Sequence, residues 1–161
     1  MIKITTADNQ KKYNLYKKML ANLNASINNE FFLQAVFIEY AILEDRCNSI
    51  IRVLLGEKSL ESKSMQGCGI DKKISKIKNY VHNNTKDAWI KKFLNDDLLD
   101  RVLSWKNQRN KMVHSLMVQF DSEDIQTELM ELAIAGRNIA KEFKNTANKI
   151  KNHQLKKNKN I

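Results

Sequence analysis

Three polar side chains in the second half of the chain have types and a spacing that suit acid–base chemistry on a phosphate. They are Arg109, Asn110 and His114. A histidine near its unperturbed pKa accepts or donates a proton at neutral pH. An arginine holds a phosphate by two parallel hydrogen bonds and offsets the charge that develops on it, and an asparagine can orient either group. Attack by a ribose 2'-hydroxyl on its own phosphodiester, without a metal, requires these groups.

The segment that carries these residues, Leu94 to Phe120, has the spacing of a helix. Its apolar stripe consists of Leu98, Val102, Trp105, Met112, Leu116 and Phe120. Arg109 falls near the middle of that stripe, whereas Asn110 and His114, four residues apart, share its border. A charged group in a partly buried place is costly unless it is paired. Glu39, at the edge of an earlier apolar stripe, is the candidate partner of Arg109. The alternative is that Arg109 is structural and bonds to a helix end or to Glu39.

The remaining sequence predicts an all-α fold. There is no proline, glycine occurs four times, and no period-two alternation is present. Helical spacing predicts helices over about 11–23, 30–55, 70–81, 85–93, 94–120 and 122–150. We expect one domain over 1–150, an up-down bundle of four to five helices, and a basic, frayed tail over 151–161. The wide apolar arcs of the second and central helices favour a homodimer along the central helix, although burial within the core also explains them.

Charge and residue types narrow the class of function. The formal net charge of +10 favours an anionic partner, nucleic acid before membrane. Candidates to contact an RNA backbone are Lys72, Lys73, Lys76 and Lys106; the alternative is a solvated lysine-rich face. Neither the two cysteines nor the three histidines have metal-ligand spacing, so we expect no metal and no cofactor. No apolar run reaches the roughly 18 residues of a membrane span, and a reducing cytoplasm fits the cysteine usage.

The segment W-K-N-Q-R-N-K-M-V-H-S-L, from Trp105 to Leu116, resembles the signature of the HEPN superfamily. That signature is an R-x4-6-H motif, usually with Asn, His or Asp directly after the Arg, in the next-to-last long helix of a helical bundle. Arg109, Asn110 and His114 match it. The resemblance implies a dimer that brings two motifs into one cleft and forms a metal-independent endoribonuclease site. Many members are toxins of toxin–antitoxin or phage-defence systems, often encoded beside a nucleotidyltransferase-like antitoxin.

The resemblance also implies roles for the motif residues. Arg109 would position the scissile phosphate, His114 would act as general acid or base, and Asn110 would orient one of them. The alternative is a non-catalytic HEPN bundle that binds a partner protein or a nucleotide, and a plain basic helical nucleic-acid binder is a third hypothesis. Trp89 is expected to be a core anchor like Trp105, and His153, in the predicted tail, is given no role.

Overall fold

The computed structural model describes residues 6–62, 65–119 and 123–159 of the 161-residue chain. The α-helices are α1 (Thr6–Asn28), α2 (Phe32–Leu55), α3 (Lys58–Glu61), α4 (Ile70–Asn79), α5 (Ala88–Phe93), α6 (Asp96–Gln119) and α7 (Glu123–Lys159), with a π-helical turn η1 (Tyr80–Asn84) after α4. These ranges contain no β-strand, so the predicted all-α class is confirmed. No helix within them is both long enough and apolar enough to cross a membrane.

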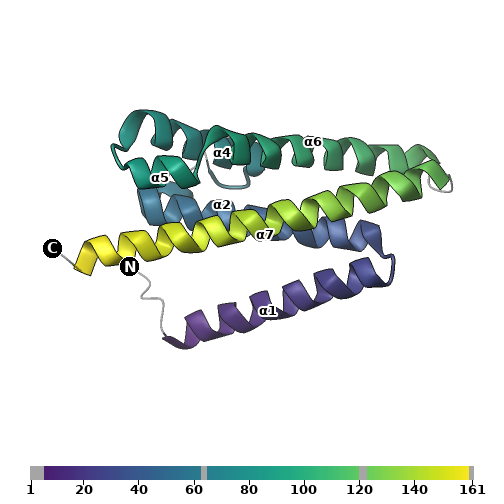
Figure 1. Ribbon diagram of the computed structural model, residues 1–161, viewed down its shortest axis with the longest axis horizontal. Helices are drawn as coiled ribbons and strands as arrows, with labels where there is room; N and C mark the ends of the chain where they lie inside the picture. Colours follow the sequence, from purple (N-terminus) through teal and green to yellow (C-terminus); the bar gives the residue numbers. More distant parts are fainter. Residues whose placement is uncertain (1–5, 63–64, 120–122, 160–161) are drawn as a thin grey trace.

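Four long helices, α1, α2, α6 and α7, run lengthwise beside one another, and α4 and α5 lie toward one end (Figure 1). Helix α2 contacts α1, α4, α6 and α7. Its wide apolar arc is therefore covered to a large extent within the chain. The sequence leaves two explanations for that arc, a homodimer and burial within the core. For α2, burial within the chain explains the arc without a second copy of the protein.

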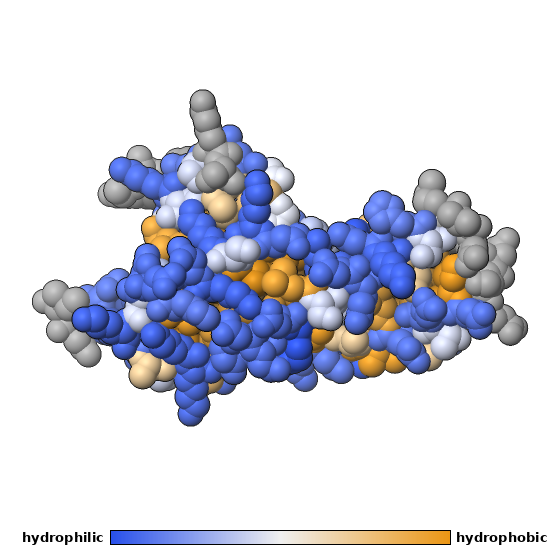
Figure 2. All heavy atoms as spheres, turned by 90° about the horizontal axis from the view of Figure 1, so that it is seen from above, coloured by the Kyte–Doolittle hydropathy of each residue, from blue (hydrophilic) through white to orange (hydrophobic). Residues whose placement is uncertain are grey.

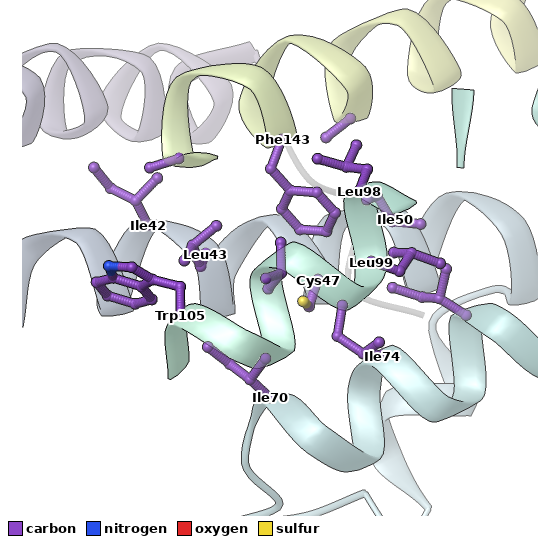
Figure 3. Packing of buried hydrophobic residues seen from close by; sticks show 14 of the residues in the cluster. Ile42, Leu43, Cys47, Ile50, Ile70, Ile74, Leu98, Leu99, Trp105 and Phe143 are labelled. Atoms are coloured by element: carbon purple, nitrogen blue, oxygen red, sulfur yellow. The ribbon is translucent and has the colours of Figure 1, made fainter. Parts of the chain in front are cut away.

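Side chains from four helices meet in the core (Figure 3). The residues labelled there are Ile42, Leu43, Cys47 and Ile50 of α2, Ile70 and Ile74 of α4, Leu98, Leu99 and Trp105 of α6, and Phe143 of α7. Trp105 is 2% exposed, and its indole N–H donates to the Leu132 carbonyl oxygen at 2.9 Å. This bond fixes α6 against α7 four residues before Arg109 and confirms Trp105 as a core anchor.

Polar residues at the helix ends set where the motif helix begins. By residue type and position, the sequence predicts Asn95 or Asp96 as the cap of α6 and Thr85 as the cap of the short helix before it. The Asn95 side chain accepts a hydrogen bond from the Leu98 N–H at 3.0 Å and so caps α6. The prediction for Thr85 is wrong. Asp87 has that role and accepts from the N–H groups of Trp89 and Ile90.

The end of the chain differs from the frayed tail predicted over 151–161. Helix α7 continues without interruption to Lys159. The reason is a tertiary contact, because Asp87 bonds to His153 at 2.9 Å and to Lys157 at 2.7 Å. The predicted start of this helix at Asp121 or Ser122 lies outside the described residues.

Candidate functional site

Arg109 points from α6 toward two aromatic rings of α2. Its guanidinium carbon lies 4.8 Å from the Phe37 ring centroid and 4.9 Å from that of Tyr40. Its Nη1 donates to Asn110 Oδ1 at 3.2 Å, whereas its buried Nε has no hydrogen-bond partner among the described residues. A guanidinium is weakly hydrated and planar, so ring faces can hold it where an ammonium would need anions. No ion pair with a described carboxylate neutralises Arg109.

The predicted pairing of Glu39 with Arg109 is wrong. Glu39 is 0% exposed, and neither of its carboxyl oxygens has a hydrogen-bond partner among the described residues. At about 100° per residue, Glu39 lies roughly 100° from Tyr40 and 160° from Phe37 around α2, away from the arginine. It faces α7, where a Cβ at Gly136 would clash with Glu39 Oε2. The position of Glu39 at the edge of the apolar stripe of α2 is therefore not enough to identify Arg109 on α6 as its partner.

The protonation state of Glu39 follows from this placement. Burial raises its pKa to about 9, and the nearby positive charge of Arg137 opposes that rise only in part. Glu39 is therefore a neutral, proton-holding carboxyl at neutral pH, packed where α2, α6 and α7 meet. Arg46 follows Glu39 by seven residues at the edge of the same apolar stripe, a spacing that also predicts a structural pair of the two. This prediction is wrong as well, because Arg46 bonds to Asp45 and its guanidinium carbon lies 4.5 Å from the Tyr16 ring centroid.

Asn110 and His114 lie on the outer side of α6. Asn110 is half-buried by its contact with Arg109, and His114 is exposed. His114 is separated from Arg109 by about 140° around the helix axis. One chain thus offers an accessible imidazole on one side of α6 and holds the guanidinium on the side toward α2.

One hollow beside Phe37 and another beside α6 lie near these residues. An apolar groove of about 680 Å³ lies between α1, α2 and α7, and Phe37, the residue beneath Arg109, lines it together with Phe31, Ile38 and Leu129. Phe31 is 60% and Phe37 46% exposed. A second hollow of about 410 Å³ lies between α6 and α7 and includes Lys111, Ser115, Glu128 and Glu131. Seen from above, the surface is mostly hydrophilic with apolar patches between the polar side chains (Figure 2).

Three of the four lysines predicted to contact RNA are bonded within the chain. Lys73 is buried and pairs with Glu44 at 2.8 Å. Lys106 pairs with Asp71 at 2.7 Å, and the Lys76 ammonium donates to the Ser59 carbonyl oxygen at 3.0 Å. In this conformation these lysines contribute to the fold, and only Lys72 is exposed as predicted.

A second polar cluster, which the sequence reasoning missed, lies where α5 meets the end of α7. His153 stacks on Trp89 with ring centroids 4.3 Å apart and an interplanar angle of 8°, and Phe93 lies 4.4 Å from Trp89. A signal for it is present in the sequence. The steps of three and four residues along α7 continue past Ile150 to His153 and Lys157.

Comparisons of the chain with protein-family models, with curated proteins and with solved structures found no match. Within 6–62, 65–119 and 123–159, no group of three or more His, Cys, Asp or Glu side chains is arranged to hold a metal ion.

Proposed function

We propose that this protein is a metal-independent endoribonuclease of the HEPN type. The observation that carries the proposal is the environment of Arg109. Its charge is stabilised by the faces of Phe37 and Tyr40 and by an uncharged amide, so it is available to a phosphate. An arginine that formed an ion pair within the fold would have a carboxylate partner that competes with a phosphate, and no described carboxylate pairs with Arg109.

We propose further that the long helices form an up-down bundle that works as a homodimer. Arg109 and His114 point to different sides of α6, so a second copy is needed to bring a guanidinium and an imidazole to one phosphodiester. The apolar groove beside Phe37 supports this arrangement, because exposed aromatic groups such as Phe31 are typical of surfaces that a partner covers. A two-fold axis near the motif would place two copies of each group in one cleft.

The reaction follows from these groups. His114 removes the proton of a ribose 2'-hydroxyl, and the 2'-oxygen attacks the adjacent phosphorus. The bond from phosphorus to the 5'-oxygen breaks, which leaves a 2',3'-cyclic phosphate and a 5'-hydroxyl. The leaving oxygen takes a proton from the second His114 of the dimer or from water. Arg109, oriented by Asn110, offsets the added negative charge on the phosphorane.

The test is cleavage of RNA by the purified protein in the presence of EDTA. We expect products with 2',3'-cyclic phosphate ends. Replacing the acid–base group or the guanidinium, in His114→Ala or Arg109→Ala, should lower the rate by about 100-fold or more. Lys111→Ala, an exposed change on the same helix, is the matched control and should leave the rate unchanged. Full activity in both motif variants, with circular dichroism unchanged, would exclude the proposed site.

A biological setting completes the proposal: a toxin–antitoxin or phage-defence protein in the cytoplasm, restrained by a nucleotidyltransferase-like antitoxin. Expression should arrest growth, and the His114→Ala variant should not. Co-expression with an adjacent nucleotidyltransferase-like gene product should relieve the arrest.

A second candidate is a non-catalytic HEPN bundle that binds a partner protein. The observation that favours it is the acidic surface beside the motif, where the side chains of Asp124, Glu128 and Glu131 are exposed. These groups would repel RNA and suit a basic protein surface. Under this candidate RNA stays intact, and a stable companion co-purifies with the chain.

A further inference from the structure

Charge is distributed unevenly along α7, which extends about 55 Å over its 37 residues. Between 124 and 134 the charged side chains are all acidic: Asp124, Glu128 and Glu131. Between 135 and 158 there is one acidic residue, Glu142, against Arg137, Lys141, Lys144, Lys149, Lys151, Lys156 and Lys157. Glu142 is itself paired with Arg101 through two hydrogen bonds, of 2.8 and 2.9 Å. The net positive charge of this helix is therefore concentrated at its C-terminal end.

Helix α5 packs against that end and adds an aromatic row, Phe93–Trp89–His153, which we call the ring ladder. Lys149 lies 4.6 Å from the Phe93 ring centroid. Asp87 holds the ladder in place, because it caps α5 and bonds both His153 and Lys157. The hydrogen bonds from Lys157 and His153 hold the pKa of Asp87 well below its usual range, so its charge is neutralised by its partners. Glu142, which lines the hollow beside Phe93, is neutralised by Arg101.

Two shallow hollows lie on either side of Lys149. One, of about 230 Å³, is lined by Trp89, Asn152, His153, Lys149 and Lys156. The other, of about 310 Å³, includes Lys92, Phe93, Asn145 and Lys149. Among the described residues no carboxylate pairs with the ammonium groups of Lys92, Lys149 or Lys156. Free cations beside aromatic walls are the combination that single-stranded nucleic acids require, since phosphates pair with the lysines and bases pack on rings.

We propose that Lys92, Lys149 and Lys156, with the ring ladder, form a surface that binds single-stranded RNA. In taking RNA as the ligand this inference rests on the proposed function, but it concerns a different place. Between Leu132, which bonds to Trp105, and His153, α7 rises about 32 Å, and Arg109 lies beyond Trp105 in the other direction. The surface binds the RNA strand several nucleotides away from the motif. Beside the motif itself, the acidic half of α7 contributes no affinity for RNA.

A single strand fits better than a duplex because the hollows are lined by ring edges and amides as well as by lysines. A duplex offers mainly its phosphates to such a surface and cannot place a base against Trp89. An anionic membrane would require several apolar side chains that project outward. Leu155 is 50% exposed at this end of α7, but the three rings of the ladder are half-buried.

The experiment measures binding of a labelled uridine oligonucleotide of about 20 nucleotides by fluorescence anisotropy, at about 50 and 200 mM salt. The protein is the full chain with His114→Ala, so that RNA survives whether or not the chain cleaves it. Adding Lys149→Gln and Lys156→Gln should weaken binding by about 10-fold or more and lower the salt slope by about 1.4, which is about 0.7 for each lost contact with a single strand. The matched control removes two charges from exposed lysines of α1, Lys17→Gln and Lys18→Gln, and should keep the affinity.

Equal losses of affinity in both double variants would mean that net charge alone attracts the RNA. This result would overturn the proposed binding surface. Equal binding of a duplex of the same length, or of anionic vesicles, would overturn its assignment to single strands. Thermal unfolding of each variant shows that the fold is intact; Lys149→Ala with Lys156→Ala provides a second substitution if the glutamines destabilise it.

Cleavage assays separate this inference from the proposed function. In the wild-type background, Lys149→Gln with Lys156→Gln should raise KM for the long oligonucleotide and leave cleavage of a dinucleotide unchanged. If no RNA is cleaved but the binding pattern holds, the proposed function fails and the surface stands. If RNA is cleaved and binding ignores Lys149 and Lys156, the surface fails and the proposed function stands.

Discussion

Two carboxyl groups in this molecule are both largely removed from water and yet have opposite properties. Glu39, where α2 meets α7, has no hydrogen-bond partner, and burial raises its pKa to about 9. Asp87, where α5 meets α7, accepts bonds from two backbone N–H groups, His153 and Lys157, and its pKa is lowered. The difference teaches that the partners of a carboxyl, more than its burial, decide its charge. The buried carboxyl beside the motif, Glu39, is neutral, whereas Asp87 and its cationic partners form an ionic cluster at the end of α7, which we call the ionic end.

The largest expected effect is at Glu39. Because its pKa is higher in the folded chain than the ordinary 4.5, the folded state keeps a proton that the unfolded state releases, and stability falls as pH rises from about 4.5 to about 9. Glu39→Gln removes this loss. We expect the variant to be more stable by about 5 kcal/mol at about pH 8 and by less than about 1 kcal/mol near pH 5, in urea unfolding at both pH values. A variant less stable than wild type at both would show that Glu39 is ionised and paired.

A smaller effect is expected at Gly136, which Glu39 and Trp105 crowd. An added Cβ would clash with Glu39 Oε2 and lie 2.6 Å from Trp105 Nε1, and the indole is fixed by its bond to Leu132. Gly136→Ala gains up to about 1 kcal/mol of helix propensity but overpacks the junction. We expect a net loss of about 2 kcal/mol in thermal unfolding. Ala135→Gly, at an exposed neighbour, is the control and should lose only the propensity. An unchanged Gly136→Ala variant would show that α2 and α7 can separate at no cost.

At the ionic end the pH dependence has the opposite sign. The pKa of Asp87 is lower in the folded chain than its ordinary value, so its contribution is present above about pH 4 and is lost as pH falls below that. Asp87→Asn keeps an acceptor for the cap of α5 and removes the charge. We expect a loss of about 1 kcal/mol at neutral pH and a smaller loss near pH 2, in chemical unfolding. An equal loss of stability at both pH values would show that Asp87 stabilises the fold by capping α5 alone.

The smallest effect distinguishes the two cationic partners of Asp87. Lys157 is 56% and His153 25% exposed in their side chains, so solvent screens the lysine more. We expect Lys157→Gln to cost about 0.5 kcal/mol or less. His153→Gln also removes the stacking on Trp89 and should cost more, with a change in tryptophan fluorescence that Lys157→Gln lacks. Equal costs without a fluorescence change would show that the ring ladder adds nothing.

Periodicity predicted the helices well because each one buries a stripe set by its own residues. Every helix expected from the spacing overlaps an observed helix, and Asn95 caps α6 as its side chain and position predict. The short helix α3 was missed because its four residues are too few to show a period. The candidate site was predicted as residues of one helix, but its surroundings were not, because Phe37 and Tyr40 are some 70 positions away along the chain.

The sequence by itself determined the all-α class, the core positions and the placement of Arg109, Asn110 and His114 on one helix, since local spacing fixes which residues share a face. Only the tertiary structure decided the partners: rings for Arg109, none for Glu39, and Asp87 for His153 and Lys157. The physical reason is that a charged side chain can be satisfied by a carboxylate, a ring face or water. Which of these it meets depends on the direction in which a second helix crosses the first.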